Sequence, residues 1–248
     1  MIKIAVLDIS GADTSLLLPT VAEELQGKIE GTKSENERAL RIAAYALLSH
    51  TFCEFMAKNG EKEAKMPTIL YTNEGKPYFD FDKESLKKGD TPPPSFSISH
   101  SERLAVVAIT DGCHSIGVDV QKMPKKSLLA RVAKRFFARF YNNENECLLD
   151  KAIAPELEIQ ISYYNLNEGK IEKISSNEEI ERHFSPRCEG FSGEEAELLR
   201  WSILEANLKT SRGFGDYPES EKLIQKTKAK ASIISLDGEI YSLAVALD

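Results

Sequence analysis

The sequence predicts an α+β fold that consists of two similar halves, residues 1–117 and 118–248. Both halves pass through helical patterns and end in apolar strands, although no short-period repeat is visible. A chain of 248 residues is long enough for one large domain or two small ones with a sizeable core. These observations favour an internally duplicated chain.

The first half begins with an apolar strand in "MIKIAVLDIS", and a helix in "TVAEELQGK" follows it. A longer helix is expected over residues 34–59, because Ser34 and Glu37 form a capping-box pattern and Gly60 suits the end of a helix. The segment "TILYTNEGKPYFDF" predicts two short strands that are joined by a turn at Asn73-Glu74-Gly75.

Three further strands are expected in "SFSISHS", "LAVVAIT" and "IGVDVQ", the last of which covers residues 116–121. In that strand aliphatic side chains alternate with Gly117, Asp119 and Gln121, so Asp119 and Gln121 share one face. Gly117 would let another part of the molecule approach the strand closely. An edge strand with one wet face is the alternative explanation for a carboxylate at this position.

The second half contains a basic helix, an acidic insertion, a long helix and a terminal hairpin. Residues 122–139 hold seven basic residues and no acidic one, and their apolar spacing predicts a basic helix at 125–139. The acidic insertion is expected at about 151–190, where alternation around Asn167-Glu168-Gly169 favours a hairpin. The last elements are a helix that starts near Ser192, is capped with Glu195 and ends at Gly213, and two strands that meet at Asp237-Gly238.

Composition excludes several classes of function. The net charge of −7 argues against nucleic acid as the main ligand, and no apolar run approaches the roughly 20 residues of a membrane-spanning helix. The N-terminal apolar run is too short for a signal peptide, so a cytoplasmic protein is expected. The four cysteines lie far apart, which favours small core residues over a zinc site or a redox dithiol. The basic helix is either a solvated face or a docking surface for an acidic partner.

Three short segments carry residue types that are suited to chemistry. Glu205 and Lys209 are four residues apart and lie on one face of the late helix, where a surface salt bridge is the alternative. Ser99 and His100 end an apolar strand, and a turn presents Lys76. Each of these features alone also fits a purely structural role.

Taken in their order along the chain, these segments resemble the 4′-phosphopantetheinyl transferases of the long monomeric, surfactin-synthetase-activating type. The matching segments are "NEGKPYF" (73–79), "FSISHSERLAVVAI" (96–109), "IGVDVQ" (116–121), "RVAKRFF" (131–137) and "WSILEANLKTSRGFG" (201–215). The family pattern for the last of them is W-[ST]-x-K-E-A-x-x-K-x-x-G-x-G. With the helix at 34–59, the resemblance covers most of the chain apart from the acidic insertion.

The resemblance implies two similar α+β halves with the active site between them, and a monomer. The implied reaction transfers the 4′-phosphopantetheine arm of coenzyme A to a serine of an apo carrier protein and releases adenosine 3′,5′-bisphosphate. The acceptors would be acidic acyl or peptidyl carrier proteins of fatty-acid, polyketide and nonribosomal-peptide synthesis, docked near the basic helix. Attack on a pyrophosphate needs its charge neutralised, and Mg²⁺ suits that role because it is a hard ion that prefers oxygen ligands.

The resemblance also implies roles for individual residues. Asp119 and Glu205 would be metal ligands, and Gln121 would point toward the same ion. Glu205 would also help to deprotonate the attacking serine, and Lys209 would stabilise the pyrophosphate and the leaving phosphate. The residues that would hold the phosphates and the nucleotide end of coenzyme A are Ser99, His100, Lys76 and Arg41, with His100 at the 3′-phosphate.

Two positions depart from the family pattern. Gln121 stands where glutamate is usual, so the metal site would lose one negative charge, and Leu204 replaces the lysine that precedes Glu205. An acidic residue that often follows the paired phenylalanines has two candidates, Glu144 and Glu146. These departures leave two alternatives open. One is a transferase-like protein that binds coenzyme A or a carrier protein without turnover, and the other is an interaction module that uses the basic helix.

Overall fold

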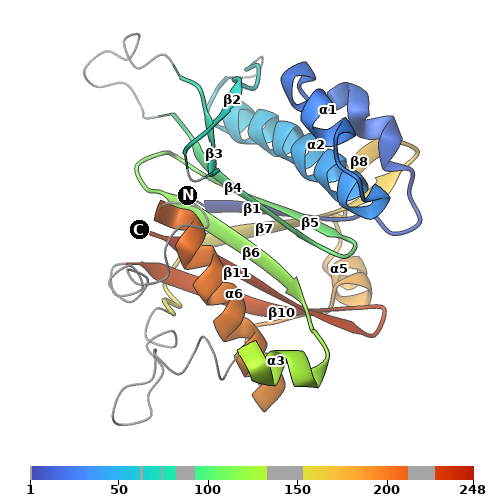
Figure 1. The fold of residues 1–248 in the computed structure, drawn as a ribbon. Coiled ribbons are helices and arrows are strands. Elements are labelled where there is room, and N and C mark those ends of the chain that lie inside the picture. Colours follow the sequence, from blue (N-terminus) through green and yellow to red (C-terminus); the bar gives the residue numbers. More distant parts are fainter. Residues whose placement is uncertain (1, 62–63, 74, 82–92, 133–152, 212–226) are drawn as a thin grey trace. The chain divides into compact units, whose positions relative to one another are not determined.

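The computed structural model describes residues 2–61, 64–73, 75–81, 93–132, 153–211 and 227–248 (Figure 1). The chain divides into two compact units: the first holds Met1–His114 and Glu158–Ile174, and the second holds Ser115–Leu157 and Ser175–Asp248. Both units combine helices with strands, which confirms the predicted α+β class. The division falls after residue 114 rather than 117, and part of the expected insertion belongs to the first unit.

A five-stranded sheet forms the centre of the first unit, in the order β4-β5-β1-β7-β8. Its strands are β1 (Ile2–Asp8), β4 (Ser95–Ser101), β5 (Leu104–Thr110), β7 (Ile159–Asn167) and β8 (Lys170–Lys173). Strand β1 pairs antiparallel with β5 and parallel with β7. Every residue of β1 and β5 is buried, as their nearly continuous apolar sequences predict for strands at the centre of a sheet.

Helix α2 covers one face of this sheet and packs on β1, β4 and β5 (Figure 1). The other elements of the unit are η1 (Thr14–Thr20), α1 (Glu23–Glu30), α2 (Glu35–Lys58) and the hairpin of β2 (Ile69–Tyr71) and β3 (Pro77–Phe79). The hydroxyl of Ser34 accepts a hydrogen bond from the backbone of Glu37 at 3.3 Å, and Gly60 has a φ of 96°. Both predicted ends of α2 are therefore confirmed.

Strands β7 and β8 are the hairpin that alternation predicted within the acidic insertion. Their turn holds Glu168 and Gly169, both with positive φ. Besides pairing with β1, the hairpin contacts the rest of the first unit through a polar network. The buried Lys3 of β1 forms an ion pair with the partly exposed Glu54 of α2, and the Tyr164 hydroxyl of β7 donates to the same carboxylate at 3.0 Å.

A four-stranded sheet forms the second unit, in the order β6-β11-β10-β9. Its strands are β6 (Ile116–Lys122), β9 (Pro186–Arg187), β10 (Lys228–Leu236) and β11 (Glu239–Leu247), and its helices include α3 (Lys126–Val132), α5 (Asn177–His183) and α6 (Gly193–Ser211). Figure 1 shows α6 lying across β6, β11 and β10. The Asp237-Gly238 turn joins β10 and β11, as predicted, and both of its residues have positive φ.

The predicted capping box at the start of α6 is present in both directions. The Ser192 hydroxyl accepts from the backbone of Glu195 at 3.3 Å, and the Glu195 carboxylate accepts from the backbone of Ser192 at 2.7 Å. Arg187 of β9 also pairs with Glu195. The cap therefore fixes where α6 begins, whereas its predicted end at Gly213 lies outside the described residues.

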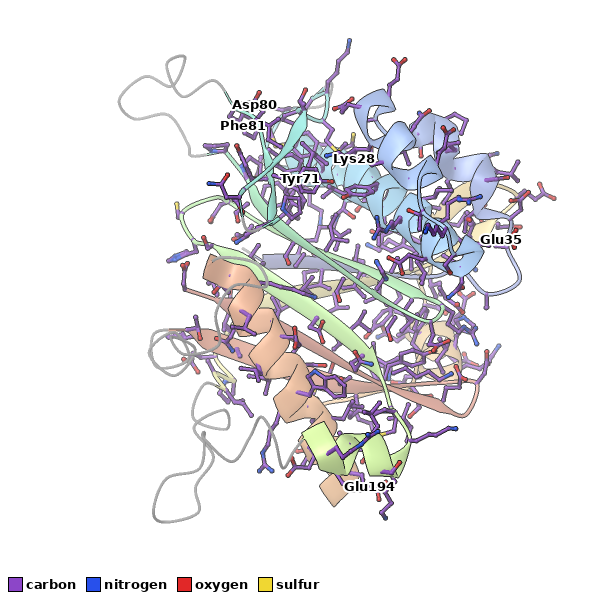
Figure 2. The ribbon with its side chains drawn as sticks, in the orientation of Figure 1. Lys28, Glu35, Tyr71, Asp80, Phe81 and Glu194 are labelled. Atoms are coloured by element: carbon purple, nitrogen blue, oxygen red, sulfur yellow. The ribbon has the colours of Figure 1, made fainter. Side chains whose placement is uncertain are left out.

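Two expectations concern the surface. Of the basic helix expected at 125–139, the structure describes α3, whose Lys126 forms an ion pair with Glu194 in the first turn of α6 (Figure 2). The expectation of core cysteines is wrong for the three that are described, because Cys53, Cys113 and Cys188 are all exposed.

No helix in the described ranges has both the length and the apolar character that are needed to cross a membrane.

Candidate functional site

The polar face of β6 packs directly against α6. Register with β11 places Gly117, Asp119 and Gln121 opposite Ala246, Ala244 and Ser242, so this face of the sheet is lined with small side chains. A Cβ atom at Gly117 would overlap the carbonyl oxygen of Ala206 and lie 2.9 Å from the backbone nitrogen of Thr210. The glycine in "IGVDVQ" is therefore required by the backbone of α6.

Asp119 is buried under this helix, with 6% of its surface exposed. Strand β6 does lie at the edge of its sheet, as the alternative explanation of Asp119 supposed. Its polar face is not wet, however, because α6 covers it. A carboxylate that is removed from water needs a compensating charge or hydrogen bonds.

Lys209 of α6 supplies the compensating charge. Its ammonium donates to Oδ1 of Asp119 at 2.8 Å and to the backbone carbonyl of Val118 at 3.1 Å. The side chains of the pair are 14% and 8% exposed, so the contact is largely shielded from solvent. The alternative role for Lys209, a salt bridge at the surface, is not what the structure shows, because Lys209 forms a largely buried pair that joins helix to strand.

Glu205 lies one helical turn before Lys209, and Trp201 lies one turn before Glu205. The Trp201 side chain is half-buried and hydrogen-bonds the Glu205 carboxylate. Burial raises the pKa of Glu205, and the negative charge of Asp119 raises it further, while Lys209 and Trp201 oppose the change. The structure therefore brings Asp119, Glu205 and Lys209 together, as their predicted roles require.

Glu205→Gln is expected to stabilise the metal-free protein at neutral pH. The native pKa of Glu205 lies above its ordinary value of 4.5, so between that value and the native pKa the folded chain binds more protons than the unfolded chain. The free energy of unfolding of the parent therefore falls as pH rises through this window. Urea unfolding in a chelator should show an advantage of the variant that grows with pH across the window, and a pH-independent difference would contradict this.

The donor atoms at this site fit a magnesium ion. Asp119 and Gln121 share one face of β6, Glu205 of α6 acts electrostatically on Asp119, and hard oxygen donors of these kinds are what Mg²⁺ prefers. The Nε2 atom of Gln121 donates to the backbone carbonyl of Lys122 at 3.3 Å. In the described part of the chain, no cluster of three or more His, Cys, Asp and Glu side chains is arranged to hold a metal.

The departure at Leu204 has a structural explanation. Leu204 is 2% exposed, so its side chain packs into the interior beside Ile203 and Leu208. It does not share a face with Glu205, because adjacent residues of a helix point in different directions. Lys209 is therefore the cation that this part of α6 brings to the carboxylates.

The candidates for binding coenzyme A lie in the first unit. Glu37 contacts two of them: its Oε1 accepts from Nε of Arg41 at 2.9 Å and lies 3.6 Å from Nε2 of His100. Ser99 is buried. It directly precedes His100 in β4, so the two side chains point to opposite faces of the sheet. The two side chains therefore do not lie on the same surface of the sheet.

Lys76 lies at the end of the β2–β3 turn, where its backbone nitrogen donates to the Thr72 hydroxyl at 3.2 Å. The preceding strand carries Tyr71, whose hydroxyl lies 2.6 Å from that of Tyr45, one turn beyond Arg41 on α2. Lys28 of α1 lies over the ring of Tyr71 at 4.0 Å (Figure 2). Lys28 thus contacts one of these tyrosines, and the charge of Arg41 acts on the other.

Sequence reasoning missed some partners and could not place others. Glu37 was assigned to the cap alone, although its spacing of four from Arg41 predicts the observed contact. Trp201 was not predicted as a partner of Glu205, although its spacing of four from Glu205 is the same signal. Glu144 and Glu146 lie outside the described residues.

Comparison with known proteins adds no assignment. No family model matches the chain, and no curated protein matches it significantly.

Proposed function

We propose that the protein is a magnesium-dependent 4′-phosphopantetheinyl transferase that modifies a serine of an apo carrier protein. The observation that carries the proposal is the cluster of Asp119, Glu205 and Lys209 on the packed faces of β6 and α6. A buried carboxylate beside a partly buried carboxylate and lysine is costly to desolvate, and such clusters are typical of functional sites. Their order in the sequence resembles the motifs of that transferase family.

The residues of this cluster suit phosphoryl-type transfer. Asp119, Glu205 and Gln121 would hold the metal, which supplies positive charge to the phosphate oxygens when it is bound. The raised pKa of Glu205 makes it a stronger base than an ordinary carboxylate, which suits a role in taking the proton of the attacking serine. The ammonium of Lys209 would stabilise charge on the pyrophosphate and the leaving phosphate.

The topology of each unit supports the proposed duplication. In the first unit a strand, β1, is followed by the long helix α2 and the hairpin β4–β5, and β1 pairs antiparallel with β5. In the second unit β6 is followed by the long helix α6 and the hairpin β10–β11, and β6 pairs antiparallel with β11. The same order and pairing in both units are what two similar halves require.

Charge in the first unit supports coenzyme A as the donor. Arg41 and His100 share the Glu37 carboxylate, and Lys76 is presented by a turn, so these three side chains are the proposed hydrogen-bond donors to phosphates. The exposed Lys125, Lys126 and Arg131 at α3 offer positive charge to an acidic carrier protein. Acyl or peptidyl carrier proteins are therefore the acceptors in this proposal.

The proposal is tested by product analysis. The protein is incubated with coenzyme A, Mg²⁺ and an apo acyl carrier protein, and the nucleotide products are separated by chromatography. We expect release of adenosine 3′,5′-bisphosphate that requires the carrier protein. Consumption of coenzyme A without the carrier protein, or no release with any acyl or peptidyl carrier, would contradict the proposal.

Gln121→Glu is expected to retain activity and to raise it when Mg²⁺ is limiting. A carboxylate in place of the amide adds one negative charge beside Asp119 and Glu205, so the concentration of Mg²⁺ at half-maximal rate should fall several-fold. The measurement is the transfer rate at increasing Mg²⁺, with rates compared again at saturation. A variant that no longer responds to Mg²⁺ would show that Gln121 does not face the ion.

One observation favours a second candidate, a protein that binds coenzyme A or a carrier protein without turnover. Leu204 occupies the motif position of a lysine and is buried, so this cation of the family pattern is lost. Calorimetry with coenzyme A separates the two candidates when it is combined with product analysis. Binding without any release of nucleotide would select the binding protein.

A further inference from the structure

We propose that Lys209 is a displaceable internal cation: its ammonium neutralises Asp119 while the metal is absent, and magnesium binding at Asp119 releases it. This inference rests on the proposed function, because it concerns the same site. It assigns to Lys209 a role before catalysis, in addition to the role toward phosphate.

The contacts of Lys209 carry the inference. Its Nζ lies 2.8 Å from Oδ1 of Asp119, the carboxylate that would hold the metal, and 3.1 Å from the carbonyl oxygen of Val118. Both side chains of the ion pair are largely buried. A divalent cation that is coordinated by Asp119 would therefore lie within a few ångströms of an ammonium in a poorly solvated site, where repulsion between like charges is strong.

The ammonium can leave because the lysine side chain is long and flexible. Lysine carries a point charge on four flexible methylenes, so the charge can move without a change in α6. While the metal is absent, the ammonium also offsets the repulsion between Asp119 and Glu205. Mg²⁺ would take over that function, and an anionic phosphate would then compensate the displaced ammonium.

This exchange couples two ligands. Mg²⁺ alone must break the Asp119–Lys209 pair without compensation, whereas Mg²⁺ with coenzyme A gives the ammonium a new partner. The two ligands should therefore bind with positive cooperativity, and each should raise the affinity for the other by the same factor. Removing the charge of Lys209 should raise the affinity for Mg²⁺ alone and lower the cooperativity between Mg²⁺ and coenzyme A.

The test is calorimetric titration of Mg²⁺ into the full chain, with and without coenzyme A. Lys209→Met is compared with the parent and with Lys122→Met, a matched control. Lys122 is also on β6 and is also paired with a carboxylate, Glu239, but its side chain points to the opposite face from Gln121. Fluorescence of Trp201, the single tryptophan, follows the same titrations beside Glu205.

We expect Lys209→Met to bind Mg²⁺ alone about tenfold more tightly than the parent and to lose most of the enhancement by coenzyme A. Lys122→Met should match the parent in both respects. Lys209→Gln, which keeps a hydrogen-bond donor for Asp119, carries the same expectation and replaces Lys209→Met if that variant does not fold. Unchanged or weaker Mg²⁺ binding in the neutral variants would overturn the inference while leaving the proposed function intact. Failure of every protein to bind Mg²⁺, with or without coenzyme A, would overturn the proposed function as well.

Discussion

Asp119→Ala and Glu205→Ala should each reduce transfer to a carrier protein by about a thousandfold or more and leave the fold intact. Each substitution removes one of the two carboxylates that would hold the metal, and Glu205→Ala also removes the proposed base. The rate is measured with coenzyme A, Mg²⁺ and an apo carrier protein, and circular dichroism checks the fold.

Glu156→Ala is the matched control for this pair, because Glu156 is an exposed carboxylate of the same unit that pairs with Lys228. Its removal should leave the transfer rate unchanged. Full activity in either Asp119→Ala or Glu205→Ala would contradict the metal assignment. Loss of activity in the control as well would show that the transfer rate depends on the overall charge of the protein rather than on these two carboxylates.

Gly117→Ala is expected to cost about 3 kcal/mol of stability, at the upper end of the range for overpacked interiors. The added methyl group would overlap the backbone carbonyl of Ala206, and backbone atoms in the middle of a helix cannot move aside cheaply. Because α6 would be pushed away from β6, the Asp119–Lys209 pair should also lengthen. Urea unfolding measures the first effect, and Mg²⁺ titration measures the second.

Gly193→Ala is the control for this prediction. Gly193 begins α6, and a Cβ atom there would meet nothing within 4 Å. This substitution should change stability by no more than about 0.5 kcal/mol. If Gly117→Ala were as stable as Gly193→Ala, the close contact between β6 and α6 would be wrong.

The sequence predicted the local features of the fold well, because they depend on neighbouring residues. Ser34 and Ser192 begin helices as hydroxyl caps, and the turns at Glu168-Gly169 and Asp237-Gly238 join hairpins. Alternation in β6 was sufficient to place Asp119 and Gln121 on one face. These signals act over two to four residues, so they can be found without knowledge of the rest of the fold.

Features that depend on distant segments could not be predicted. Parallel pairing of β7 with β1 joins residues 159–165 to residues 2–8, and nothing in either segment specifies that partner. The acidic composition of the insertion therefore gave no sign that part of it completes the sheet of the first unit. Exposure of Cys53, Cys113 and Cys188 likewise depends on what packs nearby rather than on residue type.

The candidate site also combines local features that the sequence predicts with contacts that depend on the packing of distant segments. Spacing of four residues placed Glu205 and Lys209 on one face, but only packing revealed that Lys209 pairs with Asp119 of β6. Strand alternation separates Ser99 from His100, so this arrangement was available from the sequence although it was not expected from the resemblance. The binding roles of these residues remain part of the proposal.

The central claim is that this chain modifies a carrier protein in a reaction that needs Mg²⁺. The most direct test is the intact mass of an apo acyl carrier protein after incubation with the chain and coenzyme A, with Mg²⁺ or with a chelator. The account predicts a gain of one phosphopantetheine arm with Mg²⁺, none with the chelator, and recovery when Mg²⁺ is restored. An unchanged mass across several acyl and peptidyl carrier proteins, or a gain that persists in the chelator, would contradict it.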